Sequence, residues 1–113
     1  MNDWHDVAAF ALALPGTELA TSYGQPAVKV AGKMFVSTGH QPGSFHVRST
    51  TEEKAVLMDT DPASFWQTAH YANWPGLLVR YGAADPERVQ LVIRRAWWDA
   101  MTPTRRKAHG SRP

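Results

Sequence analysis

Apolar and polar positions follow two different periods along the chain, and the changes of period mark out its elements. Near the N-terminus, apolar residues recur at the three- and four-residue spacing of an amphipathic helix over residues 3–14. Asn2 or Asp3 can cap this helix, and Pro15-Gly16 ends it. The first predicted element is therefore a helix with one buried face.

Short β-rich runs follow this helix. We expect strands over residues 27–31 and 33–38, joined by Ala31-Gly32 at a tight hairpin corner. The run 44–48 alternates polar and apolar residues, which predicts a third strand with one face in water. A fourth strand is expected over residues 77–81.

Helices are predicted around the fourth strand. Thr50 and Glu53 form a capping box that opens a short helix, and a further helical turn is expected over residues 61–67. Asp85 then caps a long helix over residues 86–98, with proline at its first position. The order α-β-β-β-α-β-α predicts the α+β class: a two-layer sandwich whose helices pack on one face of an antiparallel sheet.

Composition predicts the limits of the domain and the compartment in which it acts. The chain has 113 residues, of which 43% are hydrophobic and 19% charged, so we assign residues 1–105 to a single globular domain. Twelve basic and ten acidic residues give a net charge of +2, and residues 106–113 are expected to form a basic, disordered tail. The lack of cysteine excludes disulfides and fits a reducing compartment. Without an apolar run of membrane-spanning length or a signal-peptide pattern, we expect a cytoplasmic protein with no membrane partner.

The period of two also assigns the strand residues to the two faces of the sheet. The face under the helices is expected to carry Val28, Val30, Met34, Val36, Phe45, Val47, Leu77, Val79 and Tyr81. The open face is expected to carry Lys29, Lys33, Phe35, Ser44, His46, Arg48, Leu78 and Arg80. Four cations without an acidic residue in these strands predict an anion-binding surface. An open face that only needs polar residues for solvation and edge protection is the alternative.

The sequence shows no pattern of a catalytic or metal-binding site. The five histidines have neither the i, i+4 pairing nor the neighbouring carboxylates of a metal site. Ser22 and Ser44 lie outside any G-x-S-x-G context, and no glycine run opens a helix after a strand. We therefore expect no enzymatic activity, no catalytic residues, no cofactor and no metal.

Five tryptophans are many for this length, and they could stack on nucleic-acid bases. Because they lie on or beside predicted helices, we expect at least three of them in the core. Trp98 is the expected exception, since adjacent Trp97 and Trp98 cannot share one helix stripe. It would lie against the tail or a neighbouring chain. The tail could also continue the last helix, with a Thr102 cap and Pro103 at the first position.

Two groups of residues resemble the MmcQ/YjbR family. The first group is Leu14-Pro15-Gly16 followed by Tyr23-Gly24-x-Pro26-Ala27-x-x-Val30-x-Gly32-Lys33-x-Phe35. The second is Pro62-x-x-Phe65, His70-Tyr71, Trp74-Pro75-x-x-Leu78-Val79-Arg80 and Ala96-Trp97. The resemblance covers about residues 4–104 and implies a frataxin-like (CyaY-like) sandwich. It also implies DNA binding, proposed for the family from a double wing of basic loops. Iron, which the frataxin-like fold could suggest, is disfavoured because the first helix holds only Asp3 and Asp6 as acids.

The main hypothesis is a non-enzymatic protein that binds DNA through largely sequence-independent contacts to phosphates. The predicted nucleic-acid-binding residues are Lys29, Lys33, Arg48, Arg80, Arg105, Arg106 and Lys107. The alternative is a protein-interaction or small anionic-ligand module that uses the same open face. Its pocket would be lined by Tyr23, Phe35, His46 and Arg80.

Overall fold

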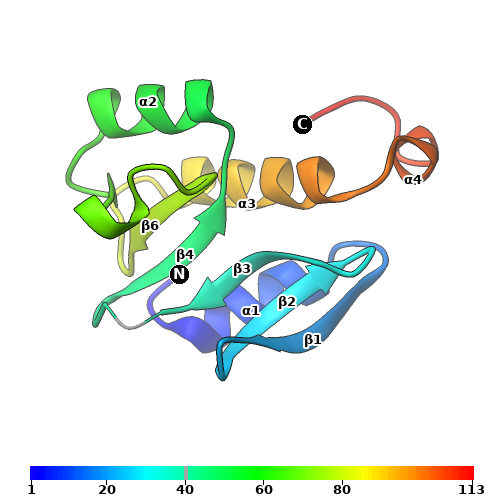
Figure 1. Cartoon of the computed structure of the whole chain (residues 1–113), viewed down its shortest axis with the longest axis horizontal. Helices are drawn as coiled ribbons and strands as arrows, with labels where there is room; N and C mark the ends of the chain where they lie inside the picture. The colour runs from blue at the N-terminus through cyan, green and yellow to red at the C-terminus, as the bar shows by residue number, and fades with distance from the viewer. Residues whose placement is uncertain (40) are drawn as a thin grey trace.

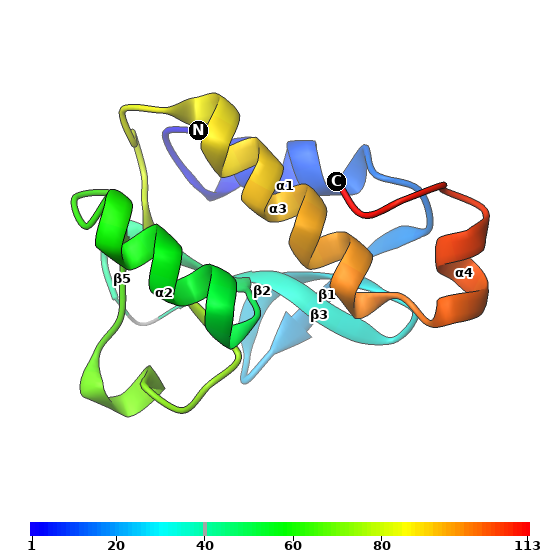
Figure 2. The same ribbon diagram turned by 90° about the horizontal axis from the view of Figure 1, so that it is seen from above.

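The computed structural model describes residues 1–39 and 41–113 and has two layers (Figure 1). Its strands are β1 (Thr17–Ser22), β2 (Gln25–Val30), β3 (Lys33–Thr38), β4 (Ser44–Arg48), β5 (Phe65–Trp66) and β6 (Gly76–Arg80). Its helices are α1 (Trp4–Leu12), α2 (Thr51–Thr60), the 3-10 helix η1 (Ala69–Tyr71), α3 (Pro86–Ala100) and α4 (Pro103–Lys107). Among the described residues, the strands form one antiparallel sheet in the order β1-β2-β3-β4-β6-β5. The helices α1, α2 and α3 lie above one face of this sheet (Figure 2), which confirms the predicted α+β sandwich.

Each α-helix is preceded by a capping residue whose side chain accepts a hydrogen bond from a backbone amide of the first turn that has no partner within the helix. In every case the acceptor takes a hydrogen bond from the amide three residues later, at donor–acceptor distances of 3.0 to 3.3 Å. The four capping residues are Asp3, Thr50, Asp85 and Thr102. The structure confirms the predicted caps Thr50 and Asp85, selects Asp3 from the two candidates at α1, and agrees with the Thr102 cap that the sequence offered as an alternative for the tail.

Two strands at the edges of the sheet were not predicted. β1 is an edge strand whose residues are exposed or half-buried, so it lacks the alternation that reveals a half-buried strand. β5 is only two residues long and lies where a helical turn was expected over residues 61–67. Its amide at Phe65 still bonds the carbonyl of Asp61 at 3.0 Å, which is the remnant of that turn.

A β-bulge in β3 changes the face assignment of three residues. Val28 of β2 pairs with Val36, but the next residue, Lys29, pairs with Met34, so Phe35 is the extra residue of β3. Phe35 is fully buried in the core under the helices, and Met34 faces the other side. The predicted open-face position of Phe35 and core position of Met34 are both wrong, because a bulge shifts the alternation by one residue. The predicted open-face position of Lys33 is wrong for the same reason, since Lys33 pairs with the core residue Val30.

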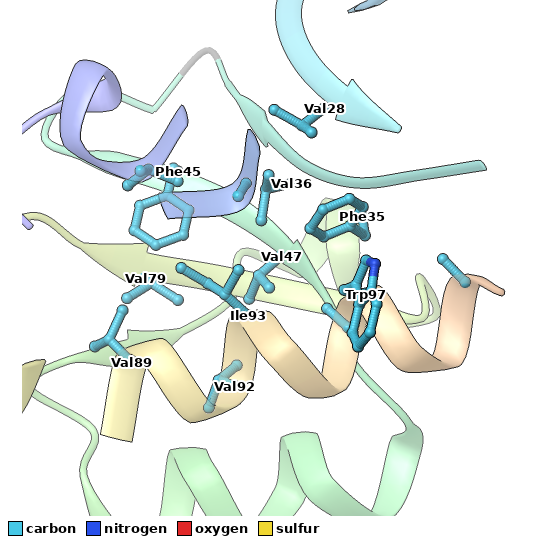
Figure 3. Packing of buried hydrophobic residues seen from close by; sticks show 14 of the residues in the cluster. Val28, Phe35, Val36, Phe45, Val47, Val79, Val89, Val92, Ile93 and Trp97 are labelled. Carbon is cyan, nitrogen blue, oxygen red and sulfur yellow. The ribbon is translucent and has the colours of Figure 1, made fainter. Parts of the chain in front are cut away.

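The hydrophobic core lies between the sheet and its helices, with α3 at its centre. Figure 3 shows residues of α3 packed against those of the strands, among them Phe35, Phe45, Val47, Val79, Val89, Val92, Ile93 and Trp97. Because α3 runs between α1 and α2 (Figure 2), its buried stripe is wide. It includes both Trp97 and Trp98, so the expectation that Trp98 lies outside the core is wrong. With the partly buried Trp4, three tryptophans pack in or against the core, as predicted.

The C-terminal residues pack on the helices. Arg106 donates two hydrogen bonds of 3.0 Å to backbone carbonyls at the end of α3. Arg112 donates to both carboxylate oxygens of Asp99 at 2.9 Å and to Glu53 of α2 at 2.6 Å. These bonds place Arg106 and Arg112 against α2 and α3. The disorder expected for residues 106–113 stays a prediction.

Candidate functional site

The helix α4 and the β2–β3 turn, which both carry cationic residues, lie at one end of the molecule (Figures 1 and 2). A methyl group placed on Gly16 would lie 3.7 Å from Nη1 of Arg105 and 3.8 Å from Cγ2 of Val30. Val30 pairs across the turn with Lys33, and cross-strand partners point to the same face. Arg105 and Lys33 therefore flank one small patch of surface. We call Lys29, Lys33, Arg105 and Lys107 the basic end.

An acidic residue also belongs to this end. Glu18 of the edge strand β1 lies directly opposite Lys29 on β2. Opposite charges in this position attract each other, with a contribution of about 0.2–1 kcal/mol. Lys33, Arg105 and Lys107 are exposed, so the end keeps a positive balance toward solvent.

The remaining predicted cations lie elsewhere. The guanidinium of Arg80 lies 4.7 Å from the centre of the Trp66 ring on the open face. Arg48 lines a groove of about 300 Å³ together with Asp99 and Arg106. Arg80 pairs with Ser44 at the other end of β4, so four residues, about 13 Å along the strand, separate the two arginines. The structure divides Lys29, Lys33, Arg48 and Arg80 among separate places and does not gather them on one face.

The open face carries a pocket of about 460 Å³, within the range of about 300–1,000 Å³ typical of small-molecule sites. We call it the open-face pocket. Its aromatic lining consists of Tyr23, His46, His70, Tyr71 and Trp74. Its polar lining consists of Ser22, Gln25, Ser37 and Thr38. The helix η1, lime green in Figure 2, forms one wall on the side of the sheet away from α1 and α3.

The aromatic wall of the pocket is a packed cluster. The ring centres of His46 and Tyr71 lie 4.7 Å apart with the planes at 69°. Trp74 lies 5.5 Å from the His46 ring and 5.7 Å from the Tyr71 ring. Edge contacts of this kind are worth about 0.5–1.5 kcal/mol each, so the wall is formed before any ligand arrives. Gly39 leaves room for this arrangement, because any side chain there would overlap the ring of His46.

A buried lysine holds this wall from behind. The Nζ of Lys54 on α2 donates to the backbone carbonyls of Tyr71 at 3.0 Å, Ala72 at 3.3 Å and Trp74 at 2.9 Å. These bonds use all three ammonium hydrogens, and only 5% of the residue is exposed. Burial lowers the pKa of Lys54 below its ordinary value, while the three carbonyl oxygens favour the charged form. Lys54 thus fixes the segment after η1 to the helix layer.

The pocket overlaps only in part with the one expected from the sequence. Tyr23 and His46 line it, as expected. Phe35 lies in the core and Arg80 lies over Trp66, so neither belongs to it. The residues that sequence reasoning missed as lining are those of the segment after η1 and the polar residues of β2 and β3. The only signal for the segment was the pair His70-Tyr71 and the nearby Trp74, which belong to the family motif.

The described residues restrict other kinds of site. No helix among them is long and apolar enough to cross a membrane. Within residues 1–39 and 41–113, no three His, Cys, Asp or Glu side chains are placed to hold a metal ion.

The fold and the open-face pocket define a small α+β domain with a site of ligand size on the uncovered face of its sheet. The model of the YjbR family matches residues 12–98, more than half of the chain, so the chain belongs to the YjbR family.

The chain is similar to a crystal structure of Deinococcus radiodurans protein DR2400, which carries a DUF419 domain. The TM-score is 0.77 and the identity 18%, and the match covers 97% of this chain and 89% of the other. At this identity the likeness supports the fold alone. None of the curated proteins matches the chain.

Proposed function

We propose that the protein binds nucleic acid through the basic end, by largely sequence-independent contacts to phosphates, and catalyses no reaction. The observation that carries the proposal is the position of Arg105 beside Gly16 and Val30. It brings the cations of α4 next to Lys33 at the hairpin corner. A hairpin and a short helix that present cations side by side also suit the basic loops that the family resemblance implies. As part of the same proposal, the cysteine-free chain acts in the cytoplasm.

Other cations are less suited to phosphates because protein groups already engage them. Arg112 and Arg95 form ion pairs with carboxylates, at 2.6 Å and 3.6 Å from Glu53 respectively. Arg106 bonds carbonyls at the end of α3. Arg80 lies over an indole ring. Of the predicted contacts, Lys33, Arg105 and Lys107 therefore remain the ones best placed, with Lys29 beside them but opposite Glu18.

The charge of the basic end sets the expected strength of binding. Each phosphate contact to B-DNA contributes about 0.9 to the slope of log K against log salt concentration, so four contacts give at most about 3.6. Dissociation constants for such non-specific binding are about 10⁻⁴ to 10⁻⁶ M at physiological salt. We expect this protein at the weak end of that range, because Glu18 offsets part of the charge.

Fluorescence anisotropy with a labelled DNA duplex of mixed sequence tests the proposal. At about 50 mM salt, where the electrostatic attraction is strong, the unmodified protein should bind and should lose affinity as salt is raised. The double variant Lys33→Glu with Arg105→Glu should bind more than tenfold more weakly. Both residues are exposed, so its folding should change by no more than about 0.5 kcal/mol per substitution.

A matched double variant separates location from net charge. Arg80→Glu with Arg94→Glu changes the charge by the same amount at two exposed residues outside the basic end. It should keep most of the affinity. Absence of binding by the unmodified protein at low salt, or equal losses in the two double variants, would contradict the proposal.

A second candidate function, a small-ligand module on the open face, is favoured by the open-face pocket. Arg80, the cation expected there, is not among the described residues that line the pocket. An anionic ligand is therefore not the chemistry that this pocket suits.

A further inference from the structure

We propose that the open-face pocket binds a planar, uncharged heteroaromatic ring of the nucleobase type. The inference goes beyond the basic end and depends on different residues, in the β1–β2 turn, β3 and the segment after η1. The two proposals can therefore fail separately.

Tyr23 is the first reason, because the fold gives no account of it. It has a φ of 50° in the β1–β2 turn, where glycine or asparagine is favoured over a bulky side chain. Its side chain is 98% exposed, so it gains no burial in return for the strained backbone. It nevertheless lines the pocket. A strained backbone position that carries an exposed aromatic ring in a pocket lining is a candidate for contact with a ligand.

The opposite wall is the second reason. Tyr71 and Trp74 present ring surfaces that His46 packs against, so their positions are fixed. Lys54 anchors the backbone of the same two residues. Aromatic rings on a rigid support suit a flat ring, since stacking of a base on an aromatic side chain is worth about 1–3 kcal/mol.

Charge and polarity are the third reason. The described lining contains no aspartate, glutamate, lysine or arginine, so none of its side chains carries a permanent charge for an ion pair. It does offer directional hydrogen bonds. The hydroxyl of Thr38 donates to Oε1 of Gln25 at 3.1 Å, which leaves the Gln25 amide nitrogen as a donor for a ligand. Ser37, only 2% exposed, adds a hydroxyl that can donate or accept. The hydrogen-bond donors and acceptors suit the polar edge of a nucleobase, and the aromatic rings suit its flat faces.

This chemistry has two possible sources: a free nucleoside, or a base of a single-stranded nucleic acid whose backbone lies outside the pocket. Adenosine and a short single-stranded adenine oligonucleotide are the probes that separate the sources. Equal affinity for both indicates the free nucleoside, and tighter binding of the strand indicates the nucleic acid.

Titration of isotope-labelled protein, followed by amide chemical shifts, tests the inference. Adenosine should shift the amides of Ser37, Thr38 and Tyr71 with a dissociation constant at or below about 1 mM, which corresponds to about −4.1 kcal/mol. Tyr23→Asn should weaken binding by fivefold or more, because it removes the ring and keeps a residue suited to the turn. The matched control Leu19→Asn changes another exposed apolar residue, on β1 and outside the pocket lining, and should bind as the unmodified protein does.

Cyclohexanol and ribose serve as the chemical controls, and neither should shift these amides. No shift with adenosine at several millimolar would overturn the inference. Binding of cyclohexanol as tightly as adenosine would also overturn it, because the pocket would then select only for apolar ligands. An unchanged affinity of Tyr23→Asn for adenosine would overturn it as well.

Discussion

The ammonium Nζ of Lys54 on α2 lies 2.9 Å from the backbone carbonyl oxygen of Trp74, a residue of the aromatic wall. The two residues belong to opposite sides of the sheet edge, one in the helix layer and the other on the open face. The bond therefore links the stability of the helix layer to the shape of the open-face pocket.

Lys54→Met should destabilise the protein and loosen this wall. The substitution keeps most of the side chain's length but leaves the three carbonyl oxygens without their donor, at a cost of about 3 kcal/mol. Chemical denaturation measures the loss. Lys107→Met, the same change at an exposed lysine, should cost no more than about 0.5 kcal/mol. If the two variants are equally stable, Lys54 does not hold the segment.

Phe35→Ala and Met34→Ala test the β-bulge. Phe35 is fully buried in the core, so its truncation should cost about 3–5 kcal/mol. Met34 is half-buried in the pocket lining, and its truncation should cost clearly less. Thermal unfolding of both variants decides the matter. If β3 alternated strictly, Met34 would lie in the core and Phe35 outside it, so Met34→Ala would be the less stable variant. That result would contradict the bulge.

Tyr81 should make stability fall in alkaline solution. Burial, and secondly the negative charge of Asp3, raise the pKa of Tyr81 above its ordinary value of 10.0. As pH rises past 10.0, the unfolded chain loses this proton before the folded protein does, so the free energy of unfolding decreases. Below about pH 9 both states keep the proton and the effect is absent.

Denaturation of the unmodified protein and of Tyr81→Phe over this pH range isolates the effect. The difference in stability between them should shift in favour of the phenylalanine variant above pH 10.0. A difference that is constant with pH would show that Tyr81 titrates alike in both states.

Arg112 should hold the C-terminal residues on the helices. Its hydrogen bonds to Asp99 and Glu53 raise its pKa, so it stays charged throughout the accessible pH range. Arg112→Met should expose the tail to trypsin at Arg105 and Lys107 and speed cleavage there. The loss of stability should be no more than about 1 kcal/mol and should shrink at high salt. A tail that is cut equally fast in the unmodified protein would instead support the disorder expected from composition.

The sequence predicts those parts of the fold that depend on neighbouring residues. The Asp85 cap and the apolar stripe of α3 are local features, and both appear as expected. The bulge at Phe35 is not local, since it arises from how β3 pairs with β2. Trp98 was misjudged for a related reason: one stripe was assumed for α3, whereas helices flank it on two sides.

The candidate sites show the same limit. The basic end joins residues of β3 and α4, and only the folded chain shows that Arg105 approaches the turn while Arg48 and Arg80 do not. The aromatic wall depends on Lys54, which lies 20 residues before Trp74 and has no signature that distinguishes it from an exposed lysine. A lysine on a helix is usually exposed, whereas Lys54 is buried.

The amide shifts caused by a DNA duplex at about 50 mM salt test the central claim most directly, because they locate the bound phosphates on the protein. We expect the largest shifts at Lys33 and its turn and along α4, with their loss in the double variant Lys33→Glu and Arg105→Glu. The account would be contradicted if a saturating concentration of duplex left the chemical shifts of these amides unchanged. It would also be contradicted if only amides around Arg80 shifted.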